Sequence, residues 1–131
     1  MTPYGRVDTT QLLVEGMRVA QFNQRLIANN IANADTPNFN PSRLDFDRTL
    51  RRAVEGVGTF QLRKADPRHL SGARIRPVMD RSVLLSKNDT NKVDLDEEMV
   101  RLSDNTGRFT TYGDFLVRRF QSIKSMLQDL R

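Results

Sequence analysis

The sequence contains no cysteine, and His69 is the only histidine among its 131 residues. Without cysteine the chain has no disulfide framework and no thiolate metal site. A single histidine argues against a histidine-based zinc site and against a catalytic triad, and the position of His69 beside Arg68 is typical of a surface turn. We therefore expect no metal ion and no cofactor.

Long apolar runs are also missing. Nothing approaches 18 consecutive apolar residues, so the sequence predicts no helix that spans a membrane. Residues 1–8 contain one arginine and no apolar run, which argues against a secretory signal peptide there. These features predict a chain without a direct membrane span.

Signs of catalysis are equally scarce. There is no glycine-rich phosphate-binding loop, and the candidates for a general acid and base are the pairs Asp45/Asp47 and Glu97/Glu98. Both pairs lie at expected helix starts and are typical of first-turn or solvated carboxylates. The sequence therefore predicts a protein that is not an enzyme.

The net charge of +5 is concentrated in residues 61–92, which carry eight basic and three acidic side chains. The basic residues are spread along this segment, without a cluster and without interleaved aromatic residues that could stack on bases. We therefore expect no nucleic-acid binding, although a nucleic-acid-binding helical protein stays as a weak alternative.

What the chain does contain is a long apolar stripe in its C-terminal third. We expect a helix over residues 94–131, begun by Asp94 as N-cap with Glu97 completing a capping box. Some 36 residues give a rod of about 54 Å, longer than a compact chain of this size is wide. Steps of four and three residues connect the apolar members of the stripe, with Thr106 and Gly113 between them: Leu95, Met99, Leu102, Phe109, Leu116, Phe120, Ile123, Leu127 and Leu130.

A second long helix is expected over residues 8–34, with Asp8 or Thr9 as N-cap. It repeats the four-three spacing, interrupted by Gln24, and is about 38 Å long. Pro37 stops it, because proline disfavours the helical region for the preceding residue. Its stripe consists of Leu13, Met17, Ala20, Ile27, Ile31 and Ala34.

The two stripes predict a mainly α fold, in which the terminal helices pair as an antiparallel coiled coil within one elongated domain, residues 1–131. Leu102, Phe109, Leu116 and Phe120 are expected to face the helix with Leu13, Met17, Ile27 and Ile31. The shorter helix leaves roughly 16 Å of the longer one uncovered. We therefore expect the isolated chain to be incompletely folded until other subunits cover this surface.

Residues 35–93 are expected to form a small irregular region. Pro37 and Asn38 fit the central positions of a type II turn, in which the third position needs positive φ. Asp45 is a candidate cap for a short helix through Val54. A short strand is expected near residues 60–63, an edge strand or extended loop near 74–83, and a polar loop over 86–92.

The turn carries a family resemblance. Its residues are similar to the signature near the N-terminus of bacterial flagellar rod and hook proteins, which typically continue with glycine and tyrosine where this chain has Asn38 and Phe39. The C-terminal pattern of residues 93–99, with the shorter stretches 104–106, 109–112 and 120–124, resembles the proximal rod proteins within that family. Residues 66–70 also match. The family turn motif comprises Asn30, Ile31, Ala32, Asn33, Ala34, Asp35, Thr36, Pro37, Asn38 and Phe39.

The resemblance implies a structural subunit of the proximal rod of the flagellar basal body, which crosses the periplasmic space and transmits motor torque in flagellum-dependent motility. It implies export in an unfolded state through the flagellum-specific type III apparatus, without a cleaved signal peptide. The implied partners are further copies of the chain, other rod subunits, the adaptor between rod and export gate (FliE-like), and the membrane ring as a further candidate. The main alternative is a soluble coiled-coil adaptor or export chaperone for flagellar parts.

Overall fold

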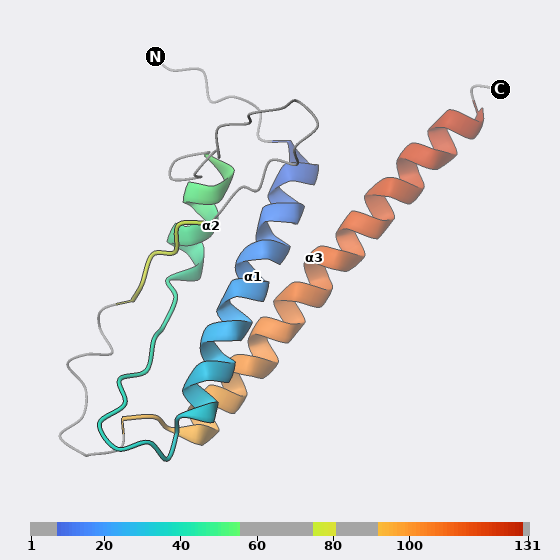
Figure 1. Ribbon diagram of the computed structural model, residues 1–131. Helices are drawn as coiled ribbons and strands as arrows, with labels where there is room; N and C mark the ends of the chain where they lie inside the picture. The colour runs from blue at the N-terminus through green and yellow to red at the C-terminus, as the bar shows by residue number, and fades with distance from the viewer. Residues whose placement is uncertain (1–7, 56–74, 81–91, 130–131) are drawn as a thin grey trace, which may run out of the picture.

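The computed structural model describes residues 8–55, 75–80 and 92–129, and within these ranges the chain forms three helices (Figure 1). Helix α1 spans Thr9–Ala32, α2 spans Phe46–Val54, and α3 spans Leu95–Asp129. The remaining described residues form turns, extended backbone and one antiparallel bridge between Leu44 and Met79. The prediction of a mainly helical chain with long helices at both ends is confirmed.

Helices α1 and α3 lie side by side, and α2 packs on α1 (Figure 1). The two long helices run in opposite directions, because Asn30 near the end of α1 contacts Glu98 near the start of α3, whereas Thr10 contacts Arg119. The apolar core is small and lies mainly along α1. Among the described residues it consists of Leu13, Val19, Ala20, Ile27, Ala53 and Val93.

Each helix begins at an aspartate that accepts a hydrogen bond from the first helical turn. Asp8 accepts from the N–H of Thr10 at 3.1 Å, and Asp45 accepts from the N–H of Arg48 at 3.0 Å. Asp94 accepts from two N–H groups of the first turn of α3, at 3.1 and 3.3 Å. The side chains satisfy donors that have no partner within the helix, and their negative charge favours the helix N-terminus. All three starts agree with the sequence-based expectation.

Helix α1 ends at Ala32 because Asn33 occupies the free carbonyl groups of the last turn. The N–H of Asn33 donates to the carbonyl oxygens of Asn29 and Asn30, at 3.2 Å each. Its side-chain amide donates to the carbonyl oxygen of Asn29 at 2.8 Å. The helix therefore stops two residues before the expected limit at position 34.

A tight turn follows over Thr36–Phe39. The N–H of Phe39 donates to the carbonyl oxygen of Thr36 at 3.2 Å, which closes the turn. Asn38, at the third position, has a φ of 60°. Asparagine tolerates this left-handed conformation better than other side chains, so the turn chemistry that the sequence predicts is confirmed at this residue.

The segment after the turn leads into α2 and meets residues 75–80. The N–H of Asp45 donates to the carbonyl oxygen of Val78, and the N–H of Asp80 donates to that of Arg43, each at 2.8 Å. The buried hydroxyl of Thr49 in α2 accepts from the N–H of Val78 at 2.9 Å. Within residues 75–80 the expected edge strand thus amounts to a single bridge. The expected strand at 60–63, His69 and the loop at 86–91 lie outside the described residues.

Helix α3 is longer than α1 and extends beyond it. Its 35 residues correspond to about 53 Å, against about 36 Å for the 24 residues of α1. Arg119 contacts Thr10 in the first turn of α1, and residues 120–128 beyond it are all exposed. We call residues 120–128 the C-terminal overhang; the end of α3 stands clear of α1 in Figure 1.

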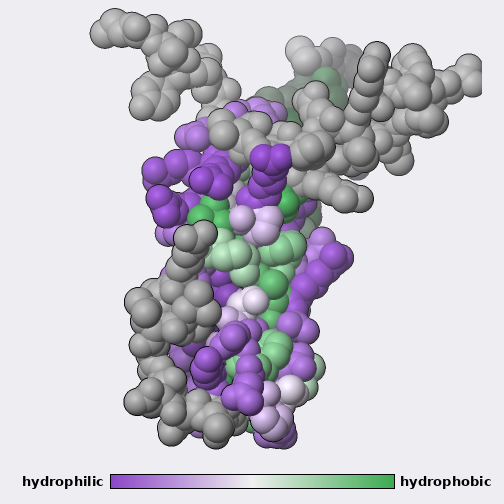
Figure 2. All heavy atoms as spheres, turned by 60° about the vertical axis from the view of Figure 1, so that its left-hand side comes forward, coloured by the Kyte–Doolittle hydropathy of each residue, from purple (hydrophilic) through white to green (hydrophobic). Residues whose placement is uncertain are grey.

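The surface on the side of α2 is largely hydrophilic. Figure 2 shows a narrow hydrophobic band between hydrophilic flanks on this face. None of the helices in the described ranges is both long and apolar enough to cross a membrane.

Candidate assembly surface

A column of mostly polar side chains on α3 faces α1. Residues seven apart lie on nearly the same face of a helix, because seven residues make about two turns. The partners on α1 are also spaced by about seven residues. We call the four resulting pairs the polar ladder: Asn30 with Glu98, Asn23 with Asn105, Gly16 with Tyr112, and Thr10 with Arg119.

The first pair of the ladder is fully buried. Asn30 is 0% exposed and Glu98 is 1% exposed, and the Asn30 side-chain N–H donates to the Glu98 carboxylate at 3.2 Å. The same amide donates to the carbonyl oxygen of Ser42 at 3.0 Å and accepts from the Ser42 N–H at 2.9 Å. One side chain therefore joins the end of α1, the segment after the turn, and the start of α3. The first asparagine of the turn motif is thus a structural junction.

The other pairs differ in chemistry. The Asn23 amide donates to the side-chain oxygen of Asn105 at 2.9 Å, while the Asn105 amide donates to the carbonyl oxygen of Ala20 at 2.9 Å. The Arg119 guanidinium donates to the Thr10 hydroxyl at 2.7 Å. These contacts satisfy polar groups along a helix interface that would otherwise leave them unpaired.

The remaining pair, Gly16 with Tyr112, is a close contact between the α1 backbone and an aromatic ring. The ring of Tyr112 lies so close to Gly16 that a Cβ atom at this position would be 2.9 Å from its Cε1 and Cζ atoms. Glycine is the residue that lets the ring approach the backbone of α1 in this way. Gly16 and Tyr112 therefore depend on each other.

Two arginines contact the acid pair Glu97/Glu98 at the start of α3. Arg43 donates to the Glu97 carboxylate at 2.6 Å and lies 3.8 Å from the Glu98 carboxylate, and Arg101 donates to Glu97 at 2.9 Å. The hydrogen bond from Arg101 is the main reason that the pKa of Glu97 lies below its usual 4.5; Arg43 lowers it further and partial burial opposes both. Glu97 thus bridges two guanidinium groups.

The carboxylates of the two acid pairs, all in or next to a first helical turn, differ in exposure. Asp45 caps α2 and Asp47 is exposed in its first turn, and Glu97 is also exposed. Glu98, in contrast, is not solvated. It is buried because Asn30 and Arg43 compensate its charge in place of water.

An aromatic contact ties α2 to α3. The rings of Phe46 and Tyr112 are stacked, with centroids 6.5 Å apart and an angle of 7° between the planes. The Arg108 guanidinium carbon lies 4.8 Å from the Phe46 centroid, and its Nε donates to Asp104 at 3.1 Å. Phe46 at the start of α2 therefore reaches across to α3.

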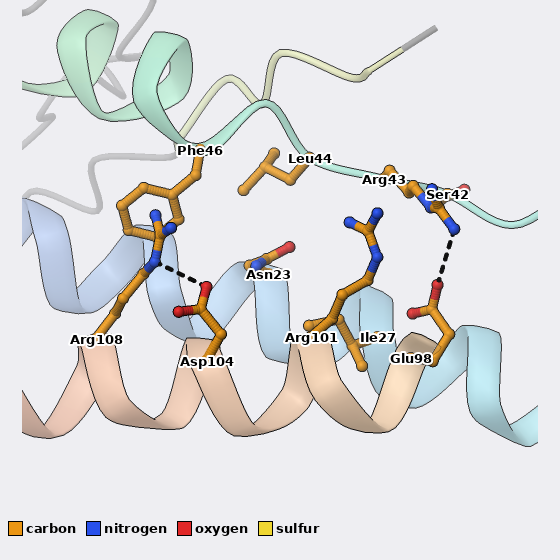
Figure 3. Close-up of a pocket in the computed structure, with 10 residues that line it drawn as sticks. All are labelled: Asn23, Ile27, Ser42, Arg43, Leu44, Phe46, Glu98, Arg101, Asp104 and Arg108. Carbon is orange, nitrogen blue, oxygen red and sulfur yellow. Dashed lines mark hydrogen bonds and ion pairs between the residues drawn. The ribbon is translucent and has the colours of Figure 1, made fainter. Parts of the chain in front are cut away.

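A small pocket of about 130 Å³ lies between the segment Ser42–Phe46 and the two long helices (Figure 3). Arg43 is paired there with Glu98, and Arg108 with Asp104. Small-molecule sites typically enclose about 300–1,000 Å³ and are mostly apolar. The described residues also contain no group of three or more metal-binding side chains. The pocket is therefore a small polar joint between these elements.

The expected stripe of α1 lies partly in the core. Leu13, Ala20 and Ile27 are buried, and Met17 and Ile31 are half-buried. Gln24, the polar interruption, is exposed, while its neighbour Asn23 contacts α3. Ala34 follows the helix end and is half-buried.

On α3 the apolar stripe is covered only in part. Leu102 and Leu116 are half-buried, but α1 leaves much of Phe109 and Phe120 uncovered. The physical reason is that the contact line runs through the polar ladder, one position away from the apolar stripe. Leu130 lies outside the described residues. The uncovered members, 37–63% exposed, form what we call the open face: Leu95, Met99, Phe109, Phe120, Ile123 and Leu127.

The sequence reasoning missed the ladder because it followed apolar residues only. A signal was present, since Asn23 and Asn30 are seven apart, and so are Glu98 and Asn105. Amides and carboxylates at heptad spacing are not what a helix seam usually contains, so the pattern was not singled out.

Comparisons with known proteins identify relatives of this chain among flagellar rod proteins. A family model described as flagella basal body rod protein matches residues 11–40, which cover most of α1 and the turn. The flagellar basal body rod protein FlgB of Borrelia hermsii is 32% identical over 120 residues, covering 84% of this chain and 88% of the relative. FlgB of Proteus mirabilis (strain HI4320) is 30% identical over 129 residues, with 92% and 94% covered. FlgB of Bacillus subtilis (strain 168) is 28% identical over 125 residues, with 91% and 92% covered.

Proposed function

The chain belongs to the FlgB family of flagellar basal body rod proteins, and on that premise we propose that the open face of α3 is the surface by which it packs against neighbouring rod subunits. Family membership makes the chain a structural component of the proximal rod and not an enzyme. The proposal adds a location for the contacts that hold such a subunit in the rod.

The observation that carries the proposal is the exposure of large apolar side chains in one line. Phe120 is 56% exposed and Leu127 is 63% exposed, although both belong to a regular apolar stripe. Soluble monomers rarely expose contiguous apolar surface of this kind, which is typical of protein interfaces. A helix from another subunit would remove this stripe from water.

The same arrangement supports an antiparallel coiled coil for α1 and α3. The polar ladder repeats at the seven-residue interval that coiled coils use, and its pairs run in opposite directions along the two helices. Two paired helices stiffened by buried contacts are suited to transmit torque along a rod. Torque transmission is the mechanical role that we assign to this pair.

The remaining parts of the proposal concern place and partners. We assign the chain to the periplasmic part of the rod, with further copies of itself, other rod subunits and the FliE-like adaptor as neighbours, and the membrane ring as a further candidate. Type III export of an unfolded chain without a cleaved signal peptide fits the absence of cysteine, since no disulfide would have to be broken before passage.

Retention in purified basal bodies tests the proposal. We expect the chain to remain in the particles after washing with high salt and detergent, in constant ratio to other rod subunits. A soluble adaptor or export chaperone would instead be removed by the washes. Recovery of the chain only in the wash fractions would overturn the proposal.

A further inference from the structure

The apolar stripes do not by themselves define how α1 lies along α3. Both repeat with a period of seven residues, so a slip of one heptad, about 10.5 Å, still places apolar residues opposite apolar residues. The connection between the helices, residues 33–94, is long enough to allow such a slip. Something else must select one register.

The polar ladder supplies this selection because each pair is chemically different. Amide meets carboxylate at Asn30, amide meets amide at Asn23, and glycine meets an aromatic ring at Gly16. In one slipped register, Tyr112 would face Asn23 and Glu98 would lose its amide donor. Leaving a buried polar group unpaired destabilises the folded chain, so both slipped pairs disfavour this register.

We propose that the polar ladder fixes the register of α1 against α3 and thereby sets the length of the C-terminal overhang. Gly16, Asn23, Asn105 and Tyr112 act as positioning residues: they contact the facing long helix and thereby determine how much of α3 is offered to a neighbouring subunit. The second half of this inference rests on the proposed function, because only a rod subunit needs a defined overhang.

The ladder predicts the effect of exchanging two of its pairs. Asn105→Tyr with Tyr112→Asn exchanges the pairs on α3 alone and mismatches both in the native register. A slip of one heptad would restore two matches, since Gly16 would then face position 105 and Asn23 would face Glu98. Adding Gly16→Asn and Asn23→Gly exchanges the pairs on both helices and restores the native register. Both variants lose the stack of Phe46 on Tyr112, so loss of this stack does not account for a difference between them.

Spin labels measure the register directly. The chain has no cysteine, so Ala28→Cys and Arg118→Cys introduce two labels at exposed positions of α1 and α3. In the native register, position 118 lies about 27 Å along the helix axis from the residue opposite position 28. The full chain is measured at a concentration where its helix content no longer rises, diluted with unlabelled chain to suppress distances between molecules.

We expect the one-sided exchange to lengthen the axial separation by about 10.5 Å, or to abolish helix pairing, and the two-sided exchange to return it to the native distance. An unchanged distance in the one-sided variant would overturn the inference. Failure of the two-sided variant to restore the native distance would also overturn it.

The outcome is separable from that of the proposed function. The distances are measured on the isolated chain and do not depend on a rod. If they shift as expected while the chain is washed from basal bodies, the register role stands and the assembly role fails. If the chain is retained but the distances do not shift, the ladder does not set the register.

Discussion

The two faces of α3 differ in chemistry and in exposure. The face toward α1 carries Glu98 and Asn105, each 1% exposed, whereas the open face carries Phe120 and Leu127, 56% and 63% exposed. In a self-sufficient globular protein the apolar face of such a helix would be covered and the polar face would meet water. Polar pairs connect the two long helices within the chain, and the reversal supports the proposal that the apolar face of α3 packs against other molecules.

This division has an energetic consequence. Buried hydrogen bonds contribute only about 1 kcal/mol each in net terms, because the same groups bond to water in the unfolded chain. Burial of apolar side chains is the larger stabilising term, and on α3 much of it awaits a partner. Folding and assembly should therefore be coupled.

The largest effect is expected from a charged side chain placed on the open face. Leu127→Asp should abolish motility, because rod assembly would bury an unpaired carboxylate at a cost of about 3 kcal/mol or more. The melting temperature of the isolated chain should hardly change, since Leu127 is exposed there. Gln128→Asp, an adjacent exposed position, introduces the same charge and should leave cells motile. Equal motility of the two strains would refute the assignment of the open face.

The covered face should respond in the opposite way, through stability of the chain itself. Asn30→Ala removes the amide that serves both Ser42 and Glu98, and each buried group left unpaired costs about 1–3 kcal/mol. At a fixed concentration where the helix content no longer rises, we expect a loss of roughly 2–5 kcal/mol in unfolding free energy by urea titration. The exposed neighbour serves as control, and Asn29→Ala should stay within about 0.5 kcal/mol of the parent. A loss below that limit for Asn30→Ala would show that the buried junction is not essential.

Two glycines sharpen the comparison between the faces. Gly16→Ala places a Cβ atom 2.9 Å from the Tyr112 ring and should destabilise the chain by about 1–3 kcal/mol. At Gly107, on the uncovered part of α3, a Cβ atom would meet nothing within 4 Å. Gly107→Ala should therefore stabilise the isolated chain by about 0.5–1 kcal/mol, through helix propensity alone. Thermal melts should show a lower melting temperature for Gly16→Ala and a higher one for Gly107→Ala. Destabilisation by Gly107→Ala would mean that the isolated chain covers this part of α3.

The smallest expected effect is a dependence on pH at the rim of the covered face. The pKa of Glu97 is lowered by Arg101 and Arg43, so its ion pairs contribute stability above pH 4.5 that is lost as the pH falls below this value. Glu97→Gln should flatten the decline of the melting temperature in that acid range. Added salt should reduce the difference, because the Glu97 side chain is 44% exposed. Identical acid profiles of parent and variant would exclude the contribution.

The helices and the turn were predictable from the sequence because their signals are local. Asp8, Asp45 and Asp94 act as caps within one helical turn. Asn38 has a positive φ because it occupies the third position of the turn that follows α1. The family resemblance, carried by the turn motif and the C-terminal pattern, was also accessible at that level.

The side of α3 that α1 covers was not predictable in the same way. The apolar stripe indicates where a helix can be covered, but not whether its own chain or another molecule covers it. The choice depends on contacts across 68 or more positions in the chain, such as Asn30 with Glu98 and Asn23 with Asn105. Polar residues at helix interfaces are recognised only when their partners are known, so the sequence indicates Glu98 as a first-turn carboxylate but not its burial.

The coupling of folding to assembly is tested most directly by circular dichroism of the isolated chain over a wide range of concentrations. The account predicts clearly less helix in dilute solution than α1, α2 and α3 contain, with the helix signal rising as concentration increases or as another rod subunit is added. A fully helical monomer with a sharp two-state melt that is independent of concentration would show that the chain folds alone, and would contradict the account.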